Sequence, residues 1–471
     1  MEEYEYAIIG QGAAAFAAAI KADELGIKTI MIGKNETNGT LLGGTCVNVG
    51  CVPSKRMITI GNMMDRINLK RFYGISYSAK IENFNKIIRE KESLVRSMRF
   101  SKYLNVLKKL KNVRYLNEFA SLKNANTLRV NEKDIKVKKI LIATGARTNV
   151  PNINGLSNVD YLTNEDALSL KKLPKSMIII GGGALGLEFA EMFSHFGVKI
   201  TLLQRSDKIL SNWEPEVSYY LENYLKESGI NIITGTTIDK ISKCRGGVGV
   251  VFLEKGTQKR IIAEKILLAT GRKPNTEKLN LEKTGVKLDE NGFIKINRRL
   301  ETSIKGIYAA GDVTGEPMLE ALAAAEGNKA TVNAFSSKKL EINLDSVPAA
   351  IFTFPEVARV GLTDKEANNR GIKCACHTVM FTDLAKAGII KDTKGLIKMV
   401  IGANNKKIIG VEIIGENAAD LIHEAALAVK FRLTINDIID TIHVFPTLSE
   451  ATKLAALSFY HKIEDLSCCS E

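Results

Sequence analysis

The sequence has no long apolar segment and no recognisable secretory signal. Nowhere does a run approach the roughly 18 apolar residues that a membrane-spanning helix needs. The first residues are acidic rather than basic and lack the apolar stretch that a signal peptide requires. Low-complexity tracts are also missing, and only nine prolines occur in 471 residues. These absences argue against a membrane protein or an exported one, and we expect a cytoplasmic protein of folded domains.

The charge balance suggests a nucleic-acid partner, but the arrangement of the basic residues opposes one. The net charge is +14, and the segment from Lys86 to Arg114 carries ten Lys and Arg residues against two Glu. Apolar residues recur through this segment at about helical spacing, which predicts an amphipathic helix with a solvated basic face. Because no aromatic residues interleave and no binding motif is present, we expect no nucleic-acid partner.

Seven cysteines are present, an odd number. In a reducing cytoplasm cysteines are more often catalytic or metal-binding than structural. Cys244, Cys374 and Cys376 lie in segments that carry no other chemical signal, so the sequence assigns them no role. The other four form two close pairs, at 46 and 51 and at 468 and 469.

Short apolar runs alternate with helical stretches, a pattern typical of parallel α/β domains. Two segments repeat the order strand, glycine turn, helix and strand, which predicts two Rossmann-type dinucleotide-binding domains. The first comprises strand Tyr6–Ile9, a helix to about Leu25 and strand Thr29–Ile32; the second begins at Met177 and comprises a helix to about Phe196 and strand Lys199–Leu203. From about Leu344 the pattern changes to that of an α+β domain, with helices near 418–431 and 448–460.

The first glycine turn is Gly10-Gln11-Gly12-Ala13-Ala14-Ala15. Gly10, Gly12 and Ala15 permit a tight turn and let backbone N–H groups approach a pyrophosphate at the helix N-terminus. Gly33 occupies the place where an acid would bind the adenosine ribose, at the end of the second strand. Glu36 is the nearest acid and is our candidate for that role.

The second glycine turn, Gly181-Gly182-Gly183-Ala184-Leu185-Gly186, completes the GxGxxG pattern with Gly181, Gly183 and Gly186. Here the following strand ends at Gln204-Arg205. An acid at this place binds a free ribose 2′-hydroxyl, whereas an arginine accommodates a 2′-phosphate. Arg205 therefore favours NADPH over NADH, unless it is simply a solvated loop residue.

The segment Gly43-Gly44-Thr45-Cys46-Val47-Asn48-Val49-Gly50-Cys51-Val52-Pro53-Ser54-Lys55 has the most specific pattern in the chain. Two cysteines five residues apart in a glycine-rich turn can close a small ring or present two thiols to one point. Pro53 suits the start of a helix, whose N-terminal dipole lowers the pKa of a nearby thiol. A pair of inert buried cysteines would leave the flanking glycines unexplained.

These motifs resemble, from end to end, those of the FAD-dependent pyridine nucleotide–disulphide oxidoreductases, which include glutathione reductase, dihydrolipoamide dehydrogenase and mercuric reductase. The resemblance implies that Cys46 exchanges with substrate, that Cys51 lies against the flavin and that Lys55 pairs with Glu188 of the second Rossmann helix. It also implies that Asp312, in Ala309-Ala310-Gly311-Asp312, binds the ribityl chain of FAD. Further contacts are assigned around these residues: Gly44, Thr45, Lys55, Thr144 and Gly145 to FAD, and Gly271 to NADPH.

The same resemblance implies a glutathione reductase-like α/β fold with two Rossmann-type domains and a C-terminal α+β dimerisation domain, assembled as a homodimer. We expect the FAD-binding domain at 1–149 and 276–343, the NADPH-binding domain at 150–275, and the dimerisation domain with its cysteine tail at 344–471.

One catalytic residue of the disulphide reductases is missing. In that family a histidine of the partner subunit, directly before a proline, is the acid–base catalyst and is oriented by a glutamate further on. This chain reads Phe445-Pro446-Thr447-Leu448-Ser449-Glu450. Glu450 is kept, but a phenyl ring that cannot transfer protons replaces the imidazole. His443 is two residues away and would not take the same place.

The chain ends in Leu466-Ser467-Cys468-Cys469-Ser470-Glu471. Neighbouring Cα atoms lie about 3.8 Å apart, below the usual disulphide range of about 4.4–6.8 Å. A disulphide between Cys468 and Cys469 would therefore be strained, and the pair is more stable as two thiols. Two thiols suit the capture of a soft, thiophilic cation. The alternative is an incidental pair of cysteines.

The missing histidine and the cysteine tail together resemble mercuric reductases, in which a C-terminal Cys-Cys pair passes Hg(II) to the redox cysteines of the other subunit. The resemblance implies that Cys46, Cys51, Cys468 and Cys469 bind the metal and that Tyr103, in a Lys-Tyr context, lies near it. A second tyrosine of that family falls at Phe445, and the N-terminal Cys-x-x-Cys domain of many members is not found, so delivery would rest on the tail. We predict NADPH- and FAD-dependent reduction of Hg(II) to Hg(0).

Three alternatives stay open at this point. A thioredoxin reductase also uses a C-terminal redox pair but keeps the histidine that Phe445 replaces. A dihydrolipoamide dehydrogenase lacks the tail and prefers NAD. A non-enzymatic protein that binds FAD and either a metal or nucleic acid would consume no NADPH with any acceptor.

Overall fold

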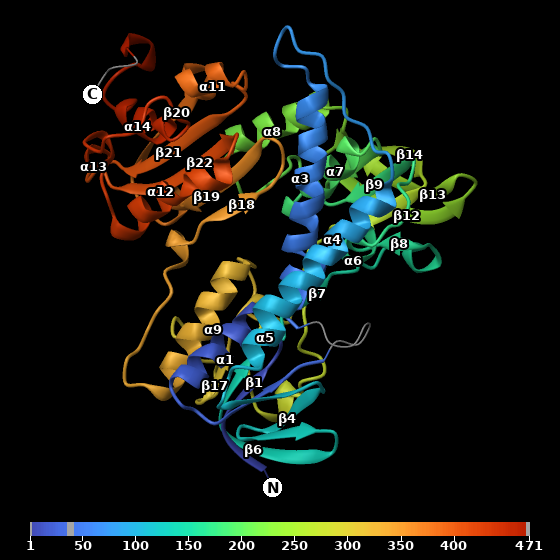
Figure 1. Cartoon of the computed structure of the whole chain (residues 1–471), viewed down its shortest axis with the longest axis vertical. Coiled ribbons are helices and arrows are strands. Elements are labelled where there is room, and N and C mark those ends of the chain that lie inside the picture. The colour runs from blue at the N-terminus through green and yellow to red at the C-terminus, as the bar shows by residue number, and fades with distance from the viewer. Residues whose placement is uncertain (1, 35–41, 468–471) are drawn as a thin grey trace.

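A computed structural model describes residues 2–34 and 42–467. Figure 1 shows three bodies: an N-terminal α/β domain at the bottom, a second α/β domain at the upper right and a C-terminal domain at the upper left. Within the described residues, their main sheets have seven, five and five strands. This division agrees with the expected pair of Rossmann-type domains followed by a domain of another type.

The first sheet has the order β3-β2-β1-β6-β5-β4, with β17 against β6. Its central strands are parallel and buried, which explains their nearly continuous apolar sequence. The strands are β1 (Glu2–Ile9), β2 (Thr29–Ile32), β3 (Val113–Leu116), β4 (Ala120–Asn124), β5 (Thr127–Val130), β6 (Lys133–Ile142) and β17 (Ile307–Ala309). The predicted strand, glycine turn, helix and strand are confirmed, with α1 spanning Ala13–Glu24 between β1 and β2.

Helix α9 (Glu320–Phe335) returns late in the sequence to lie on α1. The approach is so close that a methyl group at Gly327 would overlap the carbonyl oxygen of Ala14. Strand β17 and helix α9 therefore complete the N-terminal domain, although residues 143–306 lie between β6 and β17 in the chain.

The second sheet has the order β11-β10-β9-β15-β8. Its strands are β8 (Tyr161–Leu162), β9 (Ser176–Ile180), β10 (Lys199–Leu203), β11 (Asn231–Ile233) and β15 (Lys265–Leu268). The predicted second unit is confirmed, because α7 (Ala184–His195) joins β9 to the parallel strand β10. An antiparallel sheet of β12 (Thr236–Cys244), β13 (Gly247–Glu254) and β14 (Thr257–Ala263) was not predicted.

The C-terminal sheet has the order β18-β19-β22-β21-β20, and its paired strands are antiparallel. The strands are β18 (Ala349–Ile351), β19 (Glu356–Gly361), β20 (Cys374–Met380), β21 (Leu396–Gly402) and β22 (Ile408–Gly415). One face carries apolar residues such as Val360, Ile397 and Ile413, which pack in a core with helices α12 (Ala418–Phe431) and α14 (Glu450–Leu457). These are the two helices expected near 418–431 and 448–460.

The opposite face of this sheet carries a row of charged residues among buried apolar ones, Val357, Leu396 and Ile414, which pack in the core shared with the second α/β domain. Lys398 of β21 is paired in register with Glu412 of β22, which is paired with Arg359 of β19. Lys398 is buried against the start of helix α8 (Pro215–Glu227), where its Nζ lies 3.0 Å from Glu214 Oε2 and 2.8 Å from Glu216 Oε1. This charged face therefore joins the C-terminal domain to the second α/β domain.

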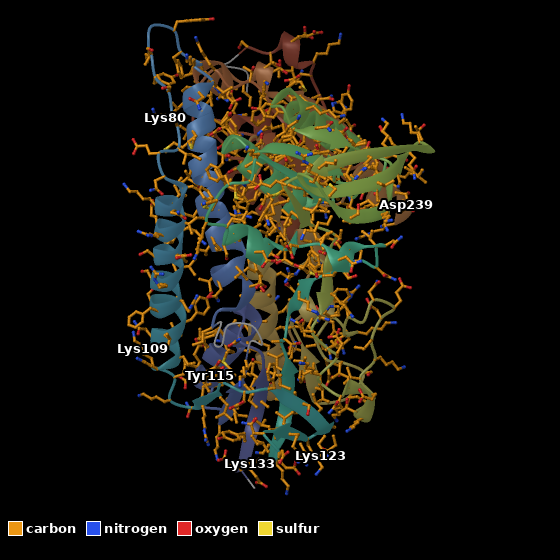
Figure 2. All side chains as sticks on the ribbon, turned by 90° about the vertical axis from the view of Figure 1, so that its right-hand side faces the viewer. Lys80, Lys109, Tyr115, Lys123, Lys133 and Asp239 are labelled. Atoms are coloured by element: carbon orange, nitrogen blue, oxygen red, sulfur yellow. The ribbon has the colours of Figure 1, made fainter. Side chains whose placement is uncertain are left out.

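Two long helices link the domains. Helix α3 (Cys51–Asn68) packs on α7, and α4 (Phe84–Arg99) runs beside it. In Figure 2 this second helix follows one outer side of the molecule, between the labelled Lys80 and Lys109. The predicted amphipathic helix is confirmed in its first part, because Phe84, Ile88 and Val95 are buried while most of the basic residues face solvent.

The remaining elements are short. They are α2 (Gly44–Val49), α5 (Asn105–Leu107), α6 (Asn164–Leu168), α10 (Asp364–Asn369), α11 (Ala385–Ile389), α13 (Ile435–Ile439), β7 (Ala146–Thr148) and β16 (Arg272–Pro274). Among the described residues, none of the helices combines the length and apolar character that crossing a membrane requires.

Candidate active site

The first glycine turn brings three strand ends together. Gly10 has a φ of +142°, and a methyl group there would overlap the carbonyl oxygen of Ala143, directly after β6. Its N–H donates to the carbonyl of Ile32 at the end of β2, 2.8 Å away. Gly12 is the N-cap of α1, and no side chain caps this helix. The first-turn N–H groups are therefore available to an anion.

The cysteine segment lies directly against this turn. The N–H of Gly43 donates to the carbonyl of Gln11, 2.9 Å away, and a Cβ at Gly44 would come within 2.7 Å of the Cα of Gly12. Helix α2 starts here and carries Thr45 and Cys46. The structure thus brings the predicted cysteine motif and the predicted dinucleotide turn together.

Cys46 and Cys51 are both free thiols in the structure. Cys46 lies in α2 and is half-buried, whereas Cys51 is the first residue of α3 and is exposed. Gly50 between the two helices has no room for a side chain, since a Cβ would come within 2.9 Å of the Thr45 carbonyl oxygen. Only glycine fits in this tight connection between α2 and α3, and the connection brings Cys46 and Cys51 close to each other.

The two thiols differ in acidity. A hydrogen bond between them, in which Cys46 donates to Cys51, lowers the pKa of Cys51, and the positive charge of Lys55 lowers it further. The same hydrogen bond and burial raise the pKa of Cys46. Cys51 is therefore the more acidic thiol of the pair, and Cys46 donates the hydrogen bond that favours its ionisation.

The predicted Lys55–Glu188 ion pair is present. Lys55 Nζ donates to Glu188 Oε2 at 2.6 Å, which joins α3 to α7. The other carboxylate oxygen of Glu188 accepts from the N–H of Phe352 at 3.0 Å, and Lys55 Nζ lies 4.7 Å from the centre of the Phe352 ring. Phe352 was not predicted, and no local signal in the sequence marks it. The pair fixes Lys55 beside the cysteines while satisfying a buried carboxylate.

Tyr103 lies next to the cysteine segment, as predicted. It belongs to a π-helical turn, Phe100–Leu104, that continues α4, and such turns are frequent at functional sites. Its ring would come within 2.9 Å of a Cβ at Gly43 and meets the Phe16 ring edge-on at 4.9 Å. Burial, and then the Cys46 sulfur, raise the pKa of Tyr103 to about 12, so the phenol is protonated at neutral pH.

Asp312 follows β17 and begins a short 3₁₀ turn. Its Oδ2 lies 3.5 Å from Arg272 Nε, and burial raises its pKa while Arg272 opposes the rise. Glu326 of α9 supports the same turn, since its Oε2 accepts from the N–H of Gly311 at 2.6 Å. Glu326 was not predicted. Asp312 therefore has unused acceptor capacity at the edge of the site.

The two similar strand ends, at Thr144-Gly145 and Thr270-Gly271, lie near each other. Strands β7 and β16 directly follow them and pair antiparallel. Thr144 Oγ1 donates to the carbonyl of Asn275 at 2.8 Å, and the Asn275 side chain donates back to the carbonyl of Thr144. A Cβ at Gly145 or Gly271 would meet nothing within 4 Å, so both glycines border open space.

The second glycine turn repeats the geometry of the first. A methyl group at Gly181 would overlap the carbonyl oxygen of Ala269, and one at Gly186 would overlap that of Gly181. Gly183, by contrast, is the uncapped N-cap of α7 and faces open space. Arg205, two residues after β10, is exposed, and Gln204 beside it accepts from the N–H of Gly182 at 2.8 Å. Arg205 therefore stands next to an open, uncapped helix N-terminus.

The C-terminal residues Phe445 and Glu450 lie in and after an exposed loop. The Phe445 side chain is exposed, while Glu450 Oε2 is buried and has no hydrogen-bond partner in the described part of the chain. Burial raises the pKa of Glu450, and the nearby His443 opposes the rise. His443 itself is held by the Thr441 carbonyl at 2.9 Å and by Glu424 Oε1 at 2.8 Å. The His443 imidazole is thus bound to Thr441 and Glu424 and does not take the place of the imidazole that Phe445 replaces.

Three predicted residues, Glu36, Cys468 and Cys469, lie outside the described residues. Among the residues that are described, no cluster of three or more His, Cys, Asp or Glu side chains could hold a metal ion. A metal at Cys46 and Cys51 would accordingly have two thiolate ligands from this part of the chain.

Comparison with known proteins agrees with this geometry. Residues 4–327 match the pyridine nucleotide-disulphide oxidoreductase family, and residues 347–456 match the dimerisation domain of the same family. A mercuric reductase of Lysinibacillus sphaericus is 40% identical over 469 residues, which cover 100% of this chain and 85% of the relative. A mercuric reductase of Staphylococcus aureus is also 40% identical over 469 residues, which cover 99% of this chain and 84% of the relative. Among solved structures, the HOCl-induced flavoprotein disulfide reductase RclA of Escherichia coli is similar with a TM-score of 0.84 and 26% identity, covering 96% of this chain and 99% of that one.

The chain therefore belongs to the pyridine nucleotide–disulphide oxidoreductases and, within them, to the mercuric reductases. It is an oxidoreductase that uses FAD and a nicotinamide cofactor. Membership of this family of enzymes excludes the non-enzymatic alternative.

Proposed function

We propose that this protein reduces Hg(II) to Hg(0) at Cys46 and Cys51, with NADPH as the electron donor and FAD as the bound cofactor. The overall reaction is NADPH + Hg(II) → NADP⁺ + H⁺ + Hg(0), in which two electrons reduce one metal ion. The observation that carries the proposal is the hydrogen-bonded pair of free cysteines beside an open dinucleotide turn, in a chain that has Phe445 where the disulphide reductases have their acid–base histidine.

The residues present fit FAD. The uncapped N-terminus of α1 at Gly12 supplies free N–H groups for the pyrophosphate, and Asp312 is a half-buried acceptor suited to a ribityl hydroxyl. Thr45, Thr144 and Gly145 border the same region. FAD held there would supply two-electron redox chemistry between the nicotinamide cofactor and the cysteine pair. The ribose-binding role of Glu36 stays a prediction.

NADPH is the proposed donor because of Arg205. The uncapped N-terminus of α7 can hold the pyrophosphate, with Gly183 facing open space. Arg205 is exposed and has no partner in the described residues, so its guanidinium is available for a 2′-phosphate.

The metal is held as a substrate by the two thiolates. Hg(II) is a soft cation and prefers thiolate sulfur, and the lowered pKa of Cys51 favours the ionised form that a ligand needs. Cys46 must lose its proton when it binds. Lys55 stabilises the negative charge of the pair, and its own position is fixed by Glu188. Tyr103 supplies a protonated hydroxyl close to the metal, where it can donate to a thiolate or to a departing ligand.

A homodimer would place the C-terminal segment of one subunit at the cysteines of the other. The exposed face of the C-terminal domain supports a dimer, because its apolar side chains are open to solvent in a single chain. They are Leu427, Phe431, Ile442, Val444 and Phe445. In this arrangement Cys468 and Cys469 deliver the metal.

The experiment that tests this function compares acceptors for NADPH oxidation by the FAD-loaded protein. Hg(II) with excess thiol should stimulate oxidation and release Hg(0), whereas thioredoxin disulphide and lipoamide should be turned over poorly, since Phe445 cannot move a proton. A disulphide acceptor reduced as fast as Hg(II) would contradict the proposal and favour a disulphide reductase.

A further inference from the structure

We propose that Cys374 and Cys376 form a second dithiol site, which binds a soft divalent cation without reducing it. This inference goes beyond the proposed function. Both cysteines lie on β20, which in the described residues is an edge strand paired with β21 alone. Figure 1 shows this strand in the C-terminal domain, apart from α3, where Cys51 begins the helix.

The strand geometry turns both sulfur atoms to the same side. Residues two apart on a strand share a face, and here it is the face that carries Lys398, since Thr378 is paired with Lys398 and Cys376 with the buried Val400. Both thiols are free and half-buried. Two thiols that share one partly open face can reach a single ligand between them.

The separation of the two cysteines suits a bridging cation better than a disulphide. On an extended strand their Cα atoms are roughly 6.6 Å apart, close to the upper end of the disulphide range of about 6.8 Å. A metal ion placed between the two sulfur atoms holds them further apart than an S–S bond does. The backbone therefore permits a two-coordinate thiolate complex with less distortion than a disulphide requires.

The surroundings of Cys374 are unusual for a structural cysteine. Its Sγ donates to Asp364 Oδ1 at 3.1 Å and lies 3.8 Å from Asn368 Oδ1, both on helix α10. Glu214 and Glu216 face the pair from the start of α8, and Lys398 faces Cys376 from β21. Glu214 and Glu216 are already ion-paired with Lys398, so the carboxylate that an approaching cation meets beside the thiols is that of Asp364, which accepts from Cys374.

Binding at this site displaces protons and moves no electrons. Each thiol loses its proton and the cation gains two sulfur ligands, so that M²⁺ + 2 RSH gives M(SR)₂ + 2 H⁺ and the complex is neutral. Burial, and then the hydrogen bond to Asp364, raise the pKa of Cys374 to about 11, and burial raises that of Cys376. Only a cation with a strong preference for sulfur can displace these protons at neutral pH, and Hg(II) and Cd(II) are such ions.

The test counts metal ions on the full-length, FAD-loaded protein. Cd(II) is added in excess without NADPH, unbound metal is removed by gel filtration in the presence of glutathione, and cadmium per chain is measured by mass spectrometry. Cys374→Ser/Cys376→Ser should retain one ion fewer than the wild type, and the matched control Cys244→Ser should retain the same number. An unchanged count in the double variant would overturn the site.

Single variants test whether the ion is bridged. Because two thiols on one strand bind as a chelate, removing either should weaken retention on the order of 10²- to 10⁴-fold in a glutathione titration. If Cys376→Ser retains the ion as well as the wild type, the ion is not shared and the proposal is wrong.

NADPH-linked Hg(II) reduction separates this site from the proposed function. The double variant should reduce Hg(II) at the wild-type rate. A wild-type protein that reduces no Hg(II) but still loses one cadmium ion on substitution of both cysteines would refute the proposed function and leave this site standing.

Discussion

At the scale of single residues, the neighbours of Cys46 and Cys51 decide which sulfur carries charge. Cys51 stands at the N-terminus of α3 with Lys55 nearby, and it accepts a hydrogen bond from Cys46. For Cys46, the hydrogen bond that it donates to Cys51 and then burial raise the pKa and work against ionisation. The sequence predicted a lowered thiol pKa in this segment from Pro53 and the helix start. Which of the two thiols it affects follows only from the contacts.

Cys46→Ala should raise the pKa of Cys51. The lost hydrogen bond acts on a charged acceptor, worth about 1.5–3 kcal/mol when buried; because Cys51 is exposed, we expect a smaller effect, a rise of about one pH unit. The thiolate fraction of Cys51 should then fall at neutral pH. The measurement is the rate of iodoacetamide alkylation at Cys51 against pH, followed by peptide mass spectrometry. A midpoint that does not move, or moves down, would show that Cys46 does not stabilise the thiolate.

Arg205→Ala should weaken NADPH use about ten- to a hundredfold, since a charge-assisted contact to phosphate contributes roughly 1.5–3 kcal/mol. NADH use should barely change. Lys199→Ala is the matched control, because Lys199 is an exposed cation at the other end of β10. The readout is kcat/KM for each cofactor. Equal losses with both cofactors would mean that Arg205 does not contact the 2′-phosphate.

At the scale of elements, the glycine turns were the parts of the fold that the sequence predicted best. Strands β2 and β10 have the predicted bounds, because a buried apolar run between a helix and a turn has clear limits. The sheet of β12, β13 and β14 was missed, since its strands are half exposed, carry many polar residues and have no motif between them. The contact from Phe352 to Glu188 was also missed, because it spans 164 residues.

The second glycine turn allows a matched pair of substitutions. Gly186→Ala should lower the free energy of unfolding by about 1–3 kcal/mol or more, since the new methyl overlaps the Gly181 carbonyl oxygen. Gly183→Ala should leave stability nearly unchanged, because its Cβ meets nothing within 4 Å and its φ is −86°. It should nevertheless weaken NADPH binding, as the methyl enters the space proposed for the pyrophosphate. Thermal unfolding and NADPH titration measure the two effects. Similar unfolding temperatures for both variants would contradict this account of the turn.

At the scale of the whole molecule, the proposed reaction depends on two subunits. In the proposed dimer, the C-terminal domain of one subunit supplies residues to the active site of the other. Glu450 is the residue that matches the histidine-orienting glutamate of the disulphide reductases. Its buried Oε2 lacks a hydrogen-bond partner in the described residues. Phe445, where an imidazole would stand, is exposed on the apolar face that a second chain would cover. The sequence predicted this substitution; how the two subunits meet cannot be read from one chain.

Phe445→His should restore part of a disulphide reductase activity. A positioned general base contributes about 10²- to 10⁴-fold, and we expect at least about a tenfold gain with lipoamide if Glu450 can orient the new imidazole. Adding Glu450→Gln to this variant should remove most of the gain. A gain that survives in the double variant would show that Glu450 plays no part.

In the proposed mechanism, Hg(II) is reduced at Cys46 and Cys51, and Cys468 and Cys469 only deliver the metal. The most direct measurement is the rate of NADPH-dependent Hg(0) release, with and without excess glutathione, for Cys46→Ser/Cys51→Ser and for Cys468→Ser/Cys469→Ser. The first variant should release no Hg(0) under either condition. The second should match the wild type with readily exchanged mercury complexes and fall behind when glutathione holds the metal, because a thiolate ligand is displaced by attack of another thiolate. Enzymatic Hg(0) release by the Cys46→Ser/Cys51→Ser variant would contradict the account.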